Sequence, residues 1–418
     1  MKSYARVSSY EGEQGEVRKV VLLYSGGLDT SCILKWIQDT YQAEVVTLTL
    51  DLGQQVDNLE HIRAKALKLG AVEALVLDLK DEFAERYLSW AIKANGTYQN
   101  DYHISTISRY LMAEKAIEVA RQTGADAIAH GCTGKGNDQV RIEATALTLQ
   151  PDIKIIAPVR EWAMGREEEL AYARQHGIEV VQRPDFPYSS DDNMWGVTWE
   201  SGEIEDMGAI PKIEKFLTVS QIEDAPAQAE LVRLTFERGV PTALNGQPMK
   251  LADLIQAMNR LGSKHGVGVS YMVEDRVVGL KIRGVYEHPG AHVLIAAHRK
   301  LEALVSTRLE NEFKALVDQK WAALCYGAMW YEPLMADLHA FCDKVNERVT
   351  GEVTVKLHKG KADVVALGSE NALYNAQMAT FMKDYTFNQN CSPGFIELYS
   401  LQMKLAHQVL KRTSAAQV

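Results

Sequence analysis

The sequence predicts an α/β protein: a doubly wound parallel-sheet domain, then a mixed α+β domain and a C-terminal helix. Between residues 18 and 176, short apolar runs alternate with stretches of helical period, as in βαβ units. Two glycine-rich segments each follow an apolar run and precede a helical pattern. The chain has 418 residues, more than one hydrophobic core usually serves, so at least two domains are expected.

Five apolar runs of strand length predict the buried parallel strands of the first domain. In chain order they are residues 18–24, 44–50, 74–79, 126–130 and 153–157. Six stretches with helical spacing of apolar residues predict the helices, at residues 28–40, 58–69, 81–95, 108–123, 137–148 and 166–176. Ligands bind at the carboxyl ends of the strands in such a sheet, so both glycine-rich loops are expected at one edge.

A segment with two prolines, residues 183–195, interrupts this alternation and marks a domain boundary. Beyond it, strand character is found at residues 229–237 and 267–283, and a hairpin is predicted from 352–357 and 362–367 around a turn at 358–361. Further helices are predicted at residues 250–261, 291–319, 332–348 and, with an amphipathic pattern, 393–411. We therefore expect a polar N-terminal extension of no assigned function, two domains and a C-terminal segment, at residues 1–16, 17–182, 183–368 and 369–418.

The first glycine-rich segment, Tyr-Ser-Gly-Gly-Leu-Asp-Thr-Ser at residues 24–31, predicts a phosphate cradle. Unpaired backbone amides and the dipole at a helix start attract an anion, and three hydroxyl side chains add donors. Leu28 follows Gly27 where a nucleoside-triphosphatase loop needs lysine, and the dinucleotide fingerprint is missing. The segment matches S-G-G-x-D-[ST]-S, the pyrophosphate loop of enzymes that split ATP between its α and β phosphates. The alternative is a tight strand-to-helix turn without a ligand.

The second glycine-rich segment, residues 127–138, also runs from an apolar stretch into a helical pattern. Its glycines allow the backbone to approach a ligand closely. The loop and helix start carry donors, acceptors and both signs of charge, at Thr133, Lys135, Asn137, Asp138 and Arg141. Asn137 or Asp138 could instead serve only as a helix cap, although capping and ligand binding are compatible.

Charge and cysteine content exclude some classes of protein. With 45 basic and 55 acidic residues the net charge is −10, which argues against a nucleic-acid binder held by phosphate contacts. The five cysteines have no C-x-x-C spacing, so free thiols in a reducing cytoplasm are expected. No apolar run approaches the roughly 18 residues that a membrane span needs, and we expect neither a secretory signal nor a membrane partner.

Together, the two loops resemble those of argininosuccinate synthase. Further segments agree in order with this family: residues 264–268, 273–276, 279–286 and 373–375. The resemblance implies that ATP, citrulline and aspartate become argininosuccinate, AMP and pyrophosphate. It implies ATP as a substrate, with Mg²⁺ as helper, without a prosthetic group or protein metal site. By itself the sequence favours packing of the amphipathic helix 393–411 on its own subunit; the resemblance instead implies a homotetramer in which the C-terminal helix reaches a neighbouring subunit.

The resemblance also assigns roles to residues whose motifs match. The ATP-binding residues are Tyr24, Ser25, Gly26, Gly27, Leu28, Asp29, Thr30, Ser31, Leu50 and Gly131. The aspartate-binding residues are Thr133, Asn137 and Asp138. The citrulline-binding residues are Tyr102, Thr106, Asn137, Arg141, Ser189, Thr198, Glu274 and Tyr286.

This chain departs from the family pattern at four places. The segment 102–110 is one residue shorter than the family's Gly-Thr-Ser-Leu-Ala-Arg-Pro region, which makes Tyr102 and Thr106 the least secure assignments. Thr198 stands where serine is common, residues 269–271 replace Arg-x-Asp, and His288 replaces a threonine.

Two rival functions stay open. Another pyrophosphate-loop enzyme, tRNA-thiolating or amide-forming, would tend to carry a glutaminase half, reactive cysteine pairs or a basic face, and none is present in the sequence. A silent nucleotide-binding protein is disfavoured because Asp138, Arg141, Glu274 and Tyr286 are retained. His288 and His292 have Pro-Gly between them and make poor helical metal ligands. Trp195 and Trp199 are expected to pack between domains rather than to stack on adenine.

Overall fold

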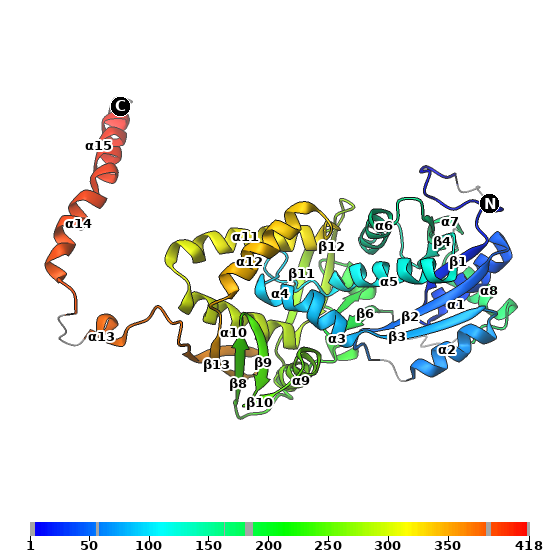
Figure 1. Cartoon of the computed structure of the whole chain (residues 1–418), viewed down its shortest axis with the longest axis horizontal. Helices are drawn as coiled ribbons and strands as arrows, with labels where there is room; N and C mark the ends of the chain where they lie inside the picture. The colour runs from blue at the N-terminus through cyan, green and yellow to red at the C-terminus, as the bar shows by residue number, and fades with distance from the viewer. Residues whose placement is uncertain (1–4, 56–57, 163, 180–186, 382–385, 416–418) are drawn as a thin grey trace. The chain divides into compact units, whose positions relative to one another are not determined.

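The computed structural model describes residues 5–55, 58–162, 164–179, 187–381 and 386–415. The chain forms two compact units, Met1–Ala372 and Leu373–Val418 (Figure 1). The predicted division of the larger unit near residue 182 stays a prediction. Among the described residues, none of the helices combines the length and apolar content that a membrane span requires.

The first sheet is parallel, in the order β3-β2-β1-β4-β5. Its strands are β1 (Lys19–Leu23), β2 (Glu44–Asp51), β3 (Glu73–Asp78), β4 (Ala127–Ala129) and β5 (Lys154–Ile156). The helices of this region are α1 (Leu28–Tyr41), α2 (Leu59–Lys68), α3 (Lys80–Phe83), α4 (Ser89–Lys93), α5 (Ser108–Thr123), α6 (Asp138–Leu149), α7 (Pro158–Glu161) and α8 (Arg166–Gln175). The predicted helix 81–95 is continuous, but a π-helical turn, Ala84–Leu88, separates α3 from α4.

Alternate residues of β1 are buried on opposite faces of the sheet. Val21 and Leu23 belong to the core that contains Leu111 and Ile117 of α5, whereas Val20 and Leu22 pack in the core that contains Ile33 and Ile37 of α1. Helices therefore cover both faces, and the predicted doubly wound fold is confirmed.

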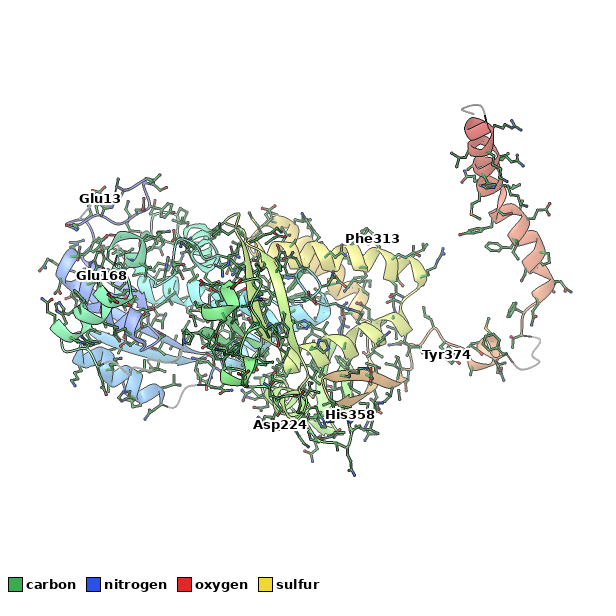
Figure 2. The ribbon with its side chains drawn as sticks, turned by 180° about the vertical axis from the view of Figure 1, so that it is seen from behind. Glu13, Glu168, Asp224, Phe313, His358 and Tyr374 are labelled. Atoms are coloured by element: carbon green, nitrogen blue, oxygen red, sulfur yellow. The ribbon has the colours of Figure 1, made fainter. Side chains whose placement is uncertain are left out.

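Two antiparallel sheets follow, in the orders β11-β12-β7-β6 and β10-β9-β8-β13-β14. Their strands are β6 (Ser189–Asn193), β7 (Gly196–Glu200), β8 (Glu230–Glu237), β9 (Val240–Leu244), β10 (Gln247–Pro248), β11 (Val269–Asp275), β12 (Lys281–Glu287), β13 (Gly351–His358) and β14 (Lys361–Gly368). The helices are α9 (Leu251–Lys264), α10 (Pro289–Val305), α11 (Arg308–Tyr326) and α12 (Pro333–Asn346). The predicted hairpin 352–367 is confirmed as β13–β14, with His358 at its turn (Figure 2).

One expectation about this region was wrong, and one stays a prediction. The single helix predicted at 291–319 is divided into α10 and α11, because Thr307 begins a new helix: its hydroxyl accepts the Glu310 N–H, and the Glu310 carboxylate accepts the Thr307 N–H. The segment 183–195 stays a predicted domain boundary; it contains strand β6, which pairs with β7 and was not predicted. Its sequence, Ser-Ser-Asp-Asp-Asn, lacks the apolar alternation that reveals a strand. Residues 183–186 of this segment lie outside the described residues.

The smaller unit contains α13 (Ala376–Ala379), α14 (Ser392–Tyr399) and α15 (Leu401–Ala415). The single helix predicted at 393–411 is thus two helices that meet at Ser400. Its expected apolar residues are all exposed in the single chain; they are Phe395, Leu398, Leu401, Leu405 and Val409. Contact of this segment with a neighbouring subunit stays a prediction.

Candidate functional site

Two adjoining cavities lie at the carboxyl edge of the parallel sheet. The first has a volume of about 1150 Å³ and reaches from the loop after β1 to β6. The second has a volume of about 280 Å³ and lies between the loop after β4 and the sheet of β7, β11 and β12. Six residues line both cavities: Gly131, Cys132, Asp138, Ser189, Ser190 and Asp191. The two predicted glycine-rich loops therefore meet at one composite site.

The loop after β1 presents uncapped backbone amides to the first cavity. Gly27 precedes α1 as its N-cap and no side chain caps the helix. Gly26 has φ 78°, a left-handed conformation, and a Cβ there would lie 2.9 Å from Ile62, so glycine is needed at this position. Most predicted ATP-binding residues line this cavity: Tyr24, Ser25, Gly27, Leu28, Asp29, Thr30, Leu50 and Gly131.

The remaining two predicted ATP-binding residues, Gly26 and Ser31, do not line the cavity. Ser31 is buried, and its hydroxyl donates to the Gly27 carbonyl at 2.6 Å and lies 3.0 Å from the Tyr24 hydroxyl. Ser31 therefore stabilises the conformation of the loop without lining the cavity. Sequence reasoning missed Lys65 of α2, whose ammonium donates to the Gly26 carbonyl at 2.8 Å.

Four apolar side chains line one part of the first cavity beyond this loop. Leu48, Leu50 and Leu52 contribute from β2 and the residues that follow it, and Ile142 contributes from α6. Trp195 and Trp199 do not line the cavity; both are buried, and their indole N–H groups donate to the His103 carbonyl and to Glu287 at 2.6 Å. Both indoles are packed inside the protein, as expected, and the expectation that they pack between two domains stays a prediction.

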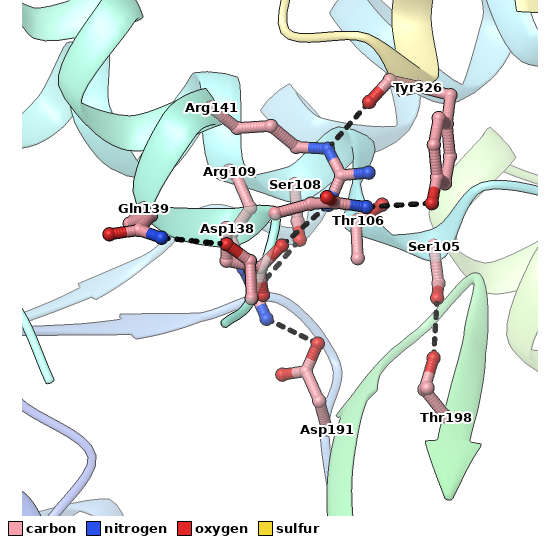
Figure 3. A network of polar contacts seen from close by, with 12 residues as sticks. Ser105, Thr106, Ser108, Arg109, Asp138, Gln139, Arg141, Asp191, Thr198 and Tyr326 are labelled. Carbon is pink, nitrogen blue, oxygen red and sulfur yellow. Dashed lines mark hydrogen bonds and ion pairs between the residues drawn. The ribbon is translucent and has the colours of Figure 1, made fainter. Parts of the chain in front are cut away.

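Asp138 stands between two buried arginines in the second cavity (Figure 3). Arg109 Nε donates to Oδ2 at 2.9 Å, and Arg141 Nη1 donates to Oδ1 at 2.6 Å. Burial raises the pKa of Asp138, but the two guanidinium groups outweigh it, so the net shift is downward and the carboxylate stays ionised. Arg109 also forms an ion pair with Asp191. Burial raises the pKa of the Asp191 carboxyl.

Glu274 of β11 accepts hydrogen bonds from two tyrosines. Tyr286 donates to Oε2 and Tyr326 donates to Oε1. Asn137 Nδ2 donates to the Tyr326 hydroxyl at 2.7 Å, which ties the loop after β4 to this acidic centre. Burial and the Glu274 carboxylate raise the pKa of Tyr286, so its phenol stays neutral and can donate.

The shortened segment 102–110 still brings its two predicted residues to the second cavity. Ile104 has φ 53°, and a 3-10 turn, Ser105–Ile107, follows it. This tight turn places the Tyr102 hydroxyl 3.2 Å from Thr106 Oγ1, and both residues line the cavity. All other predicted aspartate- and citrulline-binding residues line it too: Thr133, Asn137, Asp138, Arg141, Ser189, Thr198, Glu274 and Tyr286.

Several site residues had no local signal in the sequence. Tyr326 at the end of α11 stacks on Tyr98 with ring centroids 3.7 Å apart, and its carbonyl accepts from Arg141 Nε at 3.0 Å. Arg276 lines the second cavity, pairs with Glu200 and donates to the Lys135 carbonyl at 3.1 Å. For Arg109 the sequence offered only its place in the segment 102–110, and the polar run around Asp191 gave no signal of a site residue.

The five cysteines are free thiols, as expected. Within the described ranges, no group of three or more histidine, cysteine or acidic side chains is arranged to hold a metal ion. His288 is buried and its Nδ1 lies 3.0 Å from the Trp195 carbonyl.

Comparisons with known proteins give consistent matches along the chain. The family model of the arginosuccinate synthase N-terminal HUP domain matches residues 19–179, and that of the C-terminal domain matches residues 188–406. The argininosuccinate synthase of Pyrococcus furiosus is 50% identical over 94% of this chain and 95% of its own length. That of Brevibacillus brevis is 46% identical, over 94% and 93%. That of Halalkalibacterium halodurans is 45% identical, over 96% and 98%.

A solved structure also aligns with part of the chain. The U34-tRNA thiolase NcsA from Methanococcus maripaludis, with its [4Fe-4S] cluster, covers 43% of this chain and 63% of its own length at 14% identity. The TM-score is 0.29, too low for any conclusion about fold or function.

Proposed function

The chain belongs to the argininosuccinate synthase family, and from this premise we propose how its two cavities divide the substrates. Enzymes of this family condense citrulline with aspartate in an ATP-dependent reaction of arginine biosynthesis. The chain is accordingly a ligase that forms a carbon–nitrogen bond. A single observation supports this division of the substrates. The loop after β1, the proposed phosphate cradle, lines the first cavity, and the Asp138 carboxylate, which two arginines bind, lines the second. The two cavities share six lining residues.

ATP occupies the first cavity in this proposal. The uncapped amides at the start of α1 bind its β and γ phosphates, because backbone N–H groups and the helix dipole both favour an anion. The leucines of β2 and Ile142 offer an apolar surface to the base. The α phosphorus then lies toward Gly131, where the two cavities adjoin.

Citrulline and aspartate occupy the second cavity. Asp138 accepts from the aspartate ammonium with lone pairs that its two arginine bonds leave free, since a carboxylate offers about four acceptor sites. Thr133 and Asn137 add polar groups on the same loop. Tyr102, Thr106, Arg141, Ser189, Thr198, Glu274 and Tyr286 surround citrulline.

The reaction follows from this placement. The ureido oxygen of citrulline attacks the α phosphorus of ATP, which forms citrullyl-AMP and expels pyrophosphate into the loop after β1. The aspartate amine, having lost a proton, then attacks the ureido carbon, and AMP leaves. The residues act by positioning and by charge stabilisation, for which effective molarities reach roughly 10⁵ M or more, and no covalent enzyme intermediate is needed.

Mg²⁺, quaternary structure and location are also part of the proposal. Mg²⁺ is usually held by substrate phosphates and one or two carboxylates, and Asp29 in the first turn of α1 offers a carboxylate at the first cavity. Bound there, the ion would neutralise phosphate charge. The exposed apolar residues of α14 and α15 support a homotetramer, and five free cysteines support a cytoplasmic location.

Pyrophosphate release tests the proposal. With ATP, release should require citrulline, should proceed at a low level without aspartate, and should be unchanged by added tRNA. Cleavage of the terminal phosphate alone, or release that needs tRNA, would contradict it.

A further inference from the structure

Lys65 of α2 contacts the loop after β1, which lines the first cavity. Its ammonium donates to the Gly26 carbonyl at 2.8 Å. Ile62 stands three residues earlier, on the same face of the helix, and its side chain lies 2.9 Å from where a Cβ at Gly26 would be. Gly26 has φ 78°, a conformation that glycine adopts readily. Two neighbouring side chains of α2 therefore lie against the loop at Gly26.

The backbone of α2 is itself held in place. Ala66 is fully buried in the core that contains residues of β1 and α1, and Ile62 packs against the same core. At the start of the helix, the Asn58 side chain accepts the His61 N–H at 3.1 Å. Lys65 therefore reaches the loop from a helix that is fixed on the parallel sheet, so its ammonium can hold the carbonyl in one position.

The contact with Lys65 determines where the next backbone N–H points. The peptide between Gly26 and Gly27 is trans, so its carbonyl and its N–H point in opposite directions. Lys65 binds the carbonyl and does not line the first cavity, whereas Gly27 and Ser25 do. The Gly27 N–H is directed at the Ser25 hydroxyl, with N and O 3.4 Å apart. Good N–H···O bonds measure about 2.7–3.2 Å, so this N–H stays available to a phosphate oxygen.

The positive charge of Lys65 is not neutralised by a close carboxylate. Among the described residues, none of the acidic side chains forms an ion pair with its ammonium. Burial lowers the pKa of Lys65, and the attraction of the more distant Glu179 offsets this shift only in part. ATP and pyrophosphate carry several negative charges. An anion bound at the loop would therefore supply the counter-charge that the described side chains do not supply.

We propose that Lys65 is a positioning residue for the phosphate cradle, the loop after β1. By binding the Gly26 carbonyl it directs the Gly27 N–H toward the first cavity, and its charge polarises that peptide, so that the loop binds the leaving pyrophosphate more tightly. The inference rests on the proposed function, in which this loop binds the β and γ phosphates of ATP. It adds a residue of α2 to a phosphate site that is otherwise formed by residues 24–31.

Lys65→Met in the full chain tests this, because it removes the ammonium and keeps much of the length of the side chain. We expect the Kd for inorganic pyrophosphate with Mg²⁺, measured by isothermal titration calorimetry, and the KM for ATP each to rise about five- to thirtyfold. This is the effect of one hydrogen bond from a charged group that is only partly buried. The KM values for citrulline and aspartate should stay within about twofold. Lys68→Met is the matched control and should change none of these values, because Lys68 is exposed in the same last turn of α2.

Two further variants distinguish positioning from packing. Lys65→Arg keeps the charge and the donor, so it should recover most of the affinity for pyrophosphate; no recovery would contradict the proposal. An unchanged Kd in Lys65→Met would overturn it, even with a lowered melting temperature, since that is the result expected of a purely structural contact. Gly27→Ala separates the two levels. If it binds pyrophosphate as tightly as the unaltered enzyme, or if the unaltered enzyme does not bind it, the assignment of the loop to phosphate is wrong.

Discussion

Replacing Asp138 by asparagine removes one negative charge from the second cavity and keeps the size of the side chain. Asp138 is proposed to bind the aspartate ammonium while it accepts from Arg109 and Arg141 at 2.9 and 2.6 Å. A hydrogen bond to a charged group contributes about 1.5–3 kcal/mol. Its loss should therefore raise the KM for aspartate roughly 10- to 150-fold.

The same change should lower stability. Removing one partner of a fully buried ion pair costs about 3–5 kcal/mol, because a charge is left uncompensated, but the Asp138 side chain is 28% exposed. Arg109 keeps Asp191, and the asparagine oxygen still accepts one bond, so we expect a smaller loss of about 2–3 kcal/mol. Urea unfolding monitored by fluorescence measures it, and Asp363→Asn, an exposed residue of β14, is the control.

Two activities should separate in this variant. Citrulline-dependent release of pyrophosphate without aspartate should stay within about threefold of the unaltered enzyme, since Asp138 is not proposed to contact the reacting phosphorus. Formation of argininosuccinate should fall at low aspartate and recover at high aspartate. Equal loss of both half-reactions at saturating substrates would refute the role of Asp138.

Three other perturbations follow from the structure. Gly27 has φ −68°, and an added Cβ would lie 3.4 Å from Ser25 Oγ. Gly27→Ala should therefore fold normally, as measured by circular dichroism, but lose ATP turnover. Normal turnover in this variant would contradict the assignment of the loop as a phosphate cradle. Burial lowers the pKa of His288 from 6.5 to about 4. Between these pH values the unfolded chain binds more protons than the folded chain. The free energy of unfolding should therefore fall by up to about 3 kcal/mol as the pH drops from 6.5 to 4. His288→Gln should flatten that part of the stability curve, and an unchanged slope would contradict the buried neutral imidazole. Ornithine lacks the ureido group and should react roughly 10⁴-fold more slowly than citrulline, because buried polar groups would stay unpaired; comparable rates would exclude ureido recognition.

The departures from the family pattern had limited consequences. The missing residue in segment 102–110 is accommodated by the left-handed Ile104 and the 3-10 turn after it, so Tyr102 and Thr106 still line the second cavity. At residues 269–271, Tyr271 lies on the exposed face of β11 and is 51% exposed, away from the site.

Local sequence was sufficient to predict the loop after β1 and the doubly wound sheet. The proposed phosphate cradle consists of consecutive residues of one strand, one turn and one helix, so its geometry depends on nearby backbone conformations. Apolar runs likewise predicted all five parallel strands, since a strand covered on both faces is apolar at nearly every position. The break between α10 and α11 depends on the capping box of Thr307 and Glu310, which the apolar periodicity of residues 291–319 does not reveal.

Only the tertiary structure decided how Asp138 and Glu274 are surrounded. Arg109 and Asp191 are 82 residues apart, and Tyr326 lies 52 residues from Glu274, so no periodicity or spacing could reveal that they meet. Such contacts arise when distant elements pack around one core, and they set the charge and the hydrogen bonds of the site.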